Sequence, residues 1–378
     1  MRFAFFLSVL TIFCSQGALA NQHQCVNDES GYKSPKNYEI IENFRASKDP
    51  LILAARNLGK EVKSTECALC TKRANSASDK PAKQLGQLSK YLTPPQIKKE
   101  CILGSLQRAP GNDGYTCTNG KPKSFENKGP TSACLTEDMA NYIHLAVNKA
   151  IQCMSPEDAP IDPRFILQKI NNESAFNFFI GYGGGNGIGQ LTSHPIKAIA
   201  GWTAFKNAKP VFIQGEANYL LEDLAANENP ACAPFKKIAE ADINNPPSLY
   251  GKNTNICRWV GAGEGVSRNL IYSLAYYIHI RDNIVKPQLK KRAPSLLKND
   301  EILNNFTLVA YKSPADVKAL MDRVRLSDNS KPGKLKEQML AFNPYLNATN
   351  KKMGELIDVM HKKTATANDL RGDSCVTP

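Results

Sequence analysis

Glu173 is the side chain whose type and setting best suit chemistry. Ser174 follows it directly. Next come three phenylalanines, Phe176, Phe178 and Phe179, and then a glycine-rich loop at 181–189. Apolar surroundings disfavour the charged form of a carboxyl and so raise its pKa. A carboxyl that keeps its proton near neutral pH can serve as a general acid. The sequence therefore predicts proton-transfer chemistry at Glu173.

A helix must deliver this carboxyl. Asp162 is a good N-cap, and Pro163 stands where the first turn tolerates a missing N–H. Apolar residues then recur at helical spacing: Phe165, Ile166, Leu167 and Ile170. We expect the helix to fade at Asn171 and Asn172, which leaves Glu173 at or just past its end.

The segment after Glu173 carries a resemblance to a known family. Residues 187–192 read GIGQLT and follow both the Glu173-Ser174 pair and Asn177. This combination resembles the lysozyme-like fold of lytic transglycosylases and goose-type lysozymes, in which a helix delivers the catalytic Glu in an ES motif before a G-(L/I)-x-Q segment. The resemblance covers residues 136–318, about half of the chain. It implies a mostly α, lysozyme-like fold and a glycosidase that cleaves the β-1,4 bond of peptidoglycan.

The same resemblance implies roles for further residues. In NFTLVAYK at 305–312, Tyr311 matches a tyrosine that commonly contacts the catalytic Glu, whereas Lys312 stands where Asn is usual. Asn269 matches the start of a helix that packs behind the active site.

Three more residues are candidates for substrate binding. Gln190 and Tyr182 are expected to contact sugar. Ser174 is expected to support the local turn or to contact sugar.

The reaction has two possible outcomes. Glu173 would protonate the leaving oxygen in both. In a transglycosylase the same carboxylate then takes a proton from the muramic acid 6-hydroxyl, whereas in a lysozyme water attacks, often with a second carboxylate. Glu264, Asp282 and Asp316 are candidates for that second group, but none lies in a family motif and none is assigned.

A further resemblance is to cell-wall lysozymes of predatory bacteria, some of which favour de-N-acetylated glycan. The unusual glycine loop and Lys312 would fit an altered sugar-recognition site.

Residues 1–20 are typical of a signal peptide. Arg2 precedes an apolar run, and Ala18-Leu19-Ala20 is a small-residue cleavage site. We expect secretion or a periplasmic location after cleavage near Ala20. No later apolar run reaches the length of a membrane span, so stable membrane insertion is not expected.

The cysteines also indicate an exported protein. Removal of residues 1–20 leaves ten of the eleven cysteines, an even number that favours up to five disulfides. Zinc is the rival interpretation, because Cys67 and Cys70 have ligand-like spacing. We expect disulfides, with no metal or cofactor.

The formal net charge is +13. Such a charge favours either solubility or attraction to a polyanion. Peptidoglycan glycan strands suit an exported basic enzyme, whereas nucleic acid does not. A monomer is expected.

Three regions are predicted. They are the signal peptide at 1–20, a cysteine-containing extension at 21–130 and a catalytic domain at 131–378. The extension reads as a disulfide-stapled helical and loop cap, with a separate wall-binding module as the alternative. The clearest helices are expected at 136–154 and 268–284.

The chain has no HExxH, Walker A or GxSxG motif, and its glycine loop follows a helix rather than a strand. The alternative to an enzyme is a non-catalytic cell-wall-binding protein on a lysozyme-like fold. A secreted inhibitor or toxin would fit the cysteines but not GIGQLT.

Overall fold

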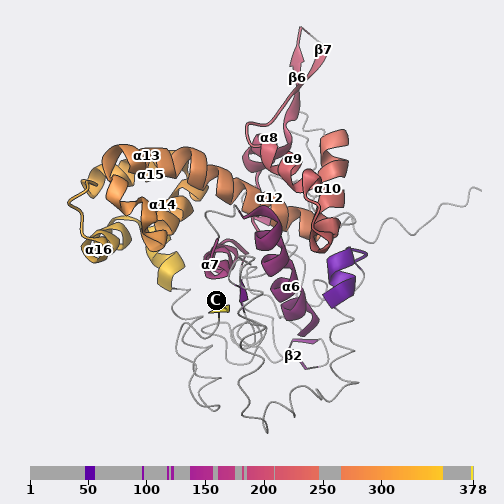
Figure 1. The fold of residues 1–378 in the computed structure, drawn as a ribbon, viewed down its shortest axis with the longest axis horizontal. Helices are drawn as coiled ribbons and strands as arrows, with labels where there is room; N and C mark the ends of the chain where they lie inside the picture. Colours follow the sequence, from indigo (N-terminus) through magenta and orange to yellow (C-terminus); the bar gives the residue numbers. More distant parts are fainter. Residues whose placement is uncertain are drawn as a thin grey trace, which may run out of the picture.

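The structure is a computed structural model. It describes residues 47–55, 137–155, 161–174, 181–182, 185–207, 209–246 and 265–351, with short strands at 96–97, 117–118, 121–122 and 376–377. About three quarters of the interpretable residues are helical, which confirms the mostly α fold class. Packed helices form the body, and the strands make two-stranded ladders (Figure 1).

Helix α12 (Gly265–His279) is the centre of this body. Of its 15 residues, all but Arg268 are buried. It packs against α6 (Glu137–Met154), α8 (Ser193–Ala200), α10 (Ala233–Asn244) and α14 (Asp300–Lys312). The helices predicted at 136–154 and 268–284 are therefore both present.

Helix α7 (Pro163–Ser174) carries Glu173. Asp162 caps it as predicted, because its Oδ1 accepts the amide N–H of Arg164 at 2.8 Å. The expected fading at Asn171 and Asn172 is wrong, since the helix continues to Ser174. The Ser174 hydroxyl donates to the Ile170 carbonyl at 3.1 Å and so supports this last turn.

Beyond α12 the chain stays helical. The elements are the π-helical segment η4 (Ile280–Val285), α13 (Lys286–Arg292), η5 (Pro294–Lys298), α14, α15 (Pro314–Arg323), α16 (Pro332–Phe342) and a helix over 344–351. The Tyr277 hydroxyl donates to Asn304 Oδ1 at 2.5 Å, and Asn304 Nδ2 donates to Gln168 Oε1 at 3.3 Å. These buried bonds join α12, α14 and α7.

A β-hairpin interrupts the helices between α8 and α9 (Tyr219–Ala226). Its strands are β6 (Trp202–Lys206) and β7 (Lys209–Ile213), and it projects away from the helical body (Figure 1). The sequence pattern did not predict this hairpin. Asn207 adopts a positive φ of 51°, a conformation that asparagine tolerates and that lets the chain reverse.

The smaller strands form three further ladders. They are β1 (Gln96–Ile97) with β8 (Val376–Thr377), β2 (Cys117–Thr118) with β3 (Lys121–Pro122), and β4 (Gly181–Tyr182) with β5 (Gly185–Asn186). The last ladder lies in the glycine-rich loop after Glu173.

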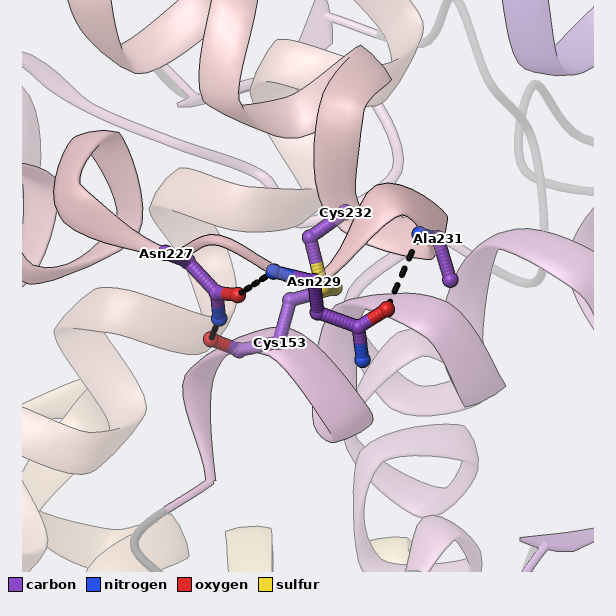
Figure 2. Close-up of a disulfide and its surroundings, with 5 residues drawn as sticks. All are labelled: Cys153, Asn227, Asn229, Ala231 and Cys232. Atoms are coloured by element: carbon purple, nitrogen blue, oxygen red, sulfur yellow. Dashed lines mark hydrogen bonds between the residues drawn. A yellow bond between two sulfur atoms is a disulfide. The ribbon is translucent and has the colours of Figure 1, made fainter.

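A disulfide links Cys153 to Cys232, across 79 residues. Cys153 lies in α6, and Cys232 ends the short helix η3 (Pro230–Cys232) (Figure 2). Asn227 Nδ2 donates to the Cys153 carbonyl at 3.1 Å, and Asn227 Oδ1 accepts the Asn229 N–H at 2.9 Å. The disulfide and the Asn227 hydrogen bonds together fasten the segment before α10 to the end of α6. The cysteine count predicted disulfides, and this is one such pair.

One segment of the N-terminal extension packs onto the body. Asp49 caps a helix over 50–55, and its Oδ2 also accepts the Ser267 N–H at 3.1 Å. Leu51 and Ile52 are buried in the same core as α12. Pro50 is the first residue of this helix.

Several predicted features lie outside the described residues. They include the signal segment 1–20, most of the extension 21–130, the phenylalanines after Ser174, and Glu264. Among the described helices, none combines the length and apolarity that crossing a bilayer requires. Within the same part of the chain, no cluster of three or more His, Cys, Asp or Glu could hold a metal ion.

Candidate active site

The Glu173 carboxylate is held by a tyrosine from the far end of the chain. Glu173 is partly buried in the last turn of α7, and its Oε1 accepts a 2.7 Å hydrogen bond from the Tyr345 hydroxyl. Its Oε2 has no hydrogen-bond partner among the described residues. The bond therefore engages one of the two carboxylate oxygens.

Tyr345 is itself oriented by its neighbours. Burial, and after it the negative charge of Glu173, raises the pKa of the Tyr345 hydroxyl far above its ordinary value. The hydroxyl therefore stays protonated and can act as a donor. The Lys312 ammonium lies 4.8 Å from the centroid of the Tyr345 ring, a cation–π contact. This contact gives Lys312 a role at the position where the resembled family has Asn.

Lys169 brings a buried positive charge one helical turn before Glu173. The residue is only 1% exposed, and its Nζ lies 4.0 Å from the Tyr311 ring centroid and 3.5 Å from the Gly189 carbonyl oxygen. Burial lowers the pKa of Lys169 to about 8, while the negative charge of Glu173 opposes the change. A charge this deep is tolerated because an aromatic face, a carbonyl and a carboxylate all lie near it.

Gly189 is the point where the elements of the site meet. Its N–H donates to Asn269 Oδ1 of α12 at 2.7 Å, and its carbonyl accepts from the Tyr311 hydroxyl of α14 at 3.4 Å. A Cβ on Gly189 would lie 1.5 Å from Ser273 Oγ. Only glycine allows this approach, which explains why the GIGQ turn carries glycine here.

Gln190 completes the same turn. Its backbone adopts a positive φ of 47°, and its side-chain Nε2 donates to the Gly187 carbonyl at 3.1 Å. The side chain thus braces the turn from within. A contact between Gln190 and sugar stays a prediction.

The other predicted residues have the following places. Tyr311 was expected to hold the Glu173 carboxyl, but its hydroxyl bonds to Gly189, and Tyr345 is the donor to Glu173. Burial, and after it the nearby negative charge of Glu173, raises the pKa of Tyr311 well above its ordinary value.

Ser174 is 1% exposed and bonded within α7, so it supports the helix. Tyr182 contributes backbone to β4, and its side chain lies outside the described part.

Asp282, one candidate for the second carboxylate, already forms ion pairs with two cations. Asp282 Oδ1 lies 2.8 Å from both Arg281 Nε and Lys286 Nζ. Burial opposes ionisation, but these cations together lower the pKa of Asp282 below its ordinary value. Asp316 is exposed in the first turn of α15. Neither described residue has a bond to Glu173.

Two members of the site, Lys169 and Tyr345, were missed. Lys169 stands four residues before Glu173, a spacing that places both on one face of a helix and was a usable signal. Tyr345 lies 172 residues after Glu173, and no local pattern links them.

Comparison with known proteins adds no relative. Neither protein-family models, nor curated proteins, nor solved structures give a match to this chain.

Replacing Gly189 with Ala should destabilise the fold by about 2 kcal/mol or more, because the new Cβ overlaps Ser273. Ser273→Gly in the same chain should recover part of this loss, as chemical denaturation of the two single variants and the double variant would measure. Gly333→Ala is the matched control, since a Cβ there meets nothing within 4 Å. Additive effects of the two substitutions would contradict the close approach.

Lys169→Met should change how stability depends on pH. The folded-state pKa of Lys169, about 8, lies below its ordinary value of 10.5, so the unfolded chain binds the extra proton between these values. Wild type should therefore gain stability relative to the variant as pH rises through this window, by up to about 3 kcal/mol.

Denaturation at about pH 7 and about pH 10 measures this difference. Lys334→Met, which changes an exposed lysine, is the control. If the difference in free energy of unfolding between wild type and Lys169→Met does not vary with pH, then burial does not lower the pKa of Lys169.

Proposed function

We propose that this chain is a peptidoglycan-cleaving glycosidase, either a lytic transglycosylase or a lysozyme, on a lysozyme-like fold. The observation that carries the proposal is the hydrogen bond between Tyr345 and Glu173 at the end of α7. It fixes a partly buried carboxyl beside a glycine turn that Asn269 and Tyr311 hold in place. The GIGQLT motif and the Glu-Ser pair support the same function by resemblance.

Glu173 is the general acid in this mechanism. Tyr345 orients the carboxyl through Oε1, so that Oε2 can face the glycosidic oxygen and deliver the proton. Lys169 and Tyr345 then stabilise the carboxylate that remains. That carboxylate next takes a proton back, either from the muramic acid 6-hydroxyl or from water. Since Asp282 is tied to two cations, a mechanism with one carboxylate is the simpler choice.

The disulfide and the net charge support the proposed setting of the protein. The Cys153–Cys232 bond supports an exported protein, because disulfides persist in oxidising compartments. The net charge of +13 favours a polyanionic target such as the wall. We propose that the mature chain acts outside the cytoplasm, as a monomer on glycan strands.

Glu173→Gln should lower the release of soluble fragments from purified peptidoglycan by about 10²–10⁴-fold, because the amide cannot donate a proton as an acid. Mass spectrometry of the wild-type products separates the two reactions, since anhydro ends indicate transglycosylation and reducing ends indicate hydrolysis. Glu337→Gln, at an exposed site on α16, is the matched control. Full activity in Glu173→Gln would refute the assignment.

Tyr345→Phe should lower kcat by about 10-fold and change KM little, because it removes one hydrogen bond to a charged group and keeps the ring against Lys312. The alkaline limb of the pH–kcat profile, where a general acid loses its proton, should also move, which a purely structural change would not cause. Tyr219→Phe, on the exposed side of α9, is the control. A kcat and a pH profile equal to those of wild type would rule out a positioning role.

A further inference from the structure

A hollow lies at the opposite end of α7 from Glu173. It has a volume of about 490 Å³ and is lined by side chains from α7, α14, α16 and the helix over 344–351. The α7 residues in it belong to the first half of that helix, and Glu173 is not among the lining residues. With a rise of 1.5 Å per residue, Phe165 and Glu173 lie about 12 Å apart along the helix axis. The hollow is therefore separate from the carboxyl.

A buried amide in this hollow lacks a partner. Asn305 is 1% exposed, and its Oδ1 accepts a 3.3 Å hydrogen bond from Asn350 Nδ2. Its own Nδ2 has no hydrogen-bond partner among the described residues. Leaving such a donor unsatisfied costs about 1–3 kcal/mol. A ligand that brings an acceptor oxygen to this N–H would recover the cost.

The rest of the inner lining is neutral. Gln168 and Asn304 are 5% and 2% exposed, and they bond to each other. Phe165 adds a partly buried aromatic ring. A sugar ring has hydroxyl groups around its edge and C–H groups on its faces. Amides can donate to and accept from the hydroxyls, and a flat aromatic ring can pack against a C–H face.

The charges at this hollow largely cancel. Asp162 and Arg164 form an ion pair at 2.5 Å, and Glu301 pairs with Lys336. Asp300 adds one exposed carboxylate at the start of α14. Two compensated pairs offer little net attraction to an anion or a strong cation, and they present many hydrogen-bonding groups to a neutral ligand.

We propose that this hollow binds a neutral saccharide unit, with Asn305 Nδ2 donating to a sugar oxygen and Phe165 lying against the ring. The site does not depend on catalysis at Glu173 and would act as a separate anchoring point for glycan. The helix over 344–351 contributes to both places, with Asn350 at the hollow and Tyr345 at Glu173.

Calorimetric titration of the full chain with a soluble trimer of β-1,4-linked N-acetylglucosamine tests this. Glu173→Gln serves as the background, so that the trimer is not consumed. Phe165→Ala and Asn305→Leu should each raise Kd by about 10-fold, the effect of one lost hydrogen bond or ring contact. The matched controls are Phe342→Ala and Asn347→Leu, which change exposed residues outside the hollow and should leave Kd unchanged.

Phe165→Ala is the decisive variant, because its ring is partly exposed and its loss should leave the melting temperature nearly unchanged. Absence of trimer binding at millimolar concentration, or binding that neither Phe165→Ala nor Asn305→Leu weakens, overturns the proposal. Weakened binding in these variants, together with full peptidoglycan release by Glu173→Gln, would keep the saccharide site and refute the proposed catalytic role. The two proposals can thus fail separately.

Discussion

The contact between the GIGQ turn and α12 is the constraint on which the candidate site depends. Gly189 comes so close to Ser273 that no side chain fits between them. That proximity lets one peptide unit bond to Asn269 on one side and to Tyr311 on the other. Three elements far apart in the sequence are thereby joined, and the Gly189 carbonyl also lies 3.5 Å from Lys169 of α7, the helix that carries Glu173.

A second constraint is electrostatic. Lys169 places a cation in the interior beside Tyr311, and Glu173 lies one turn further along the same helix. Tyr345 donates a hydrogen bond to the carboxylate, and Lys312 lies over the Tyr345 ring. Glu173 is therefore a carboxyl between a cation and a neutral donor, rather than one in purely apolar surroundings as its neighbours in the sequence had indicated.

Local pattern explains which parts of this arrangement could be predicted. Helices α6, α7 and α12 were predicted because each presents an apolar stripe at helical spacing. The end of α7 was misplaced, because Ser174 and Tyr345 stabilise a turn that the asparagines alone would end. The hairpin at 202–213 was missed, since its turn depends on one positive φ at Asn207. Tyr345 was beyond reach, because a contact across 172 residues leaves no periodic trace.

The late position of Tyr345 and Asn350 in the chain has a consequence for biosynthesis. Both residues belong to the last long segment that the structure describes, so Glu173 is made long before its hydrogen-bond donor. A polypeptide that stops short of residue 344, or is clipped there, keeps the acidic group but lacks the hydroxyl that orients it. Chains that end before Tyr345 therefore cannot form this hydrogen bond.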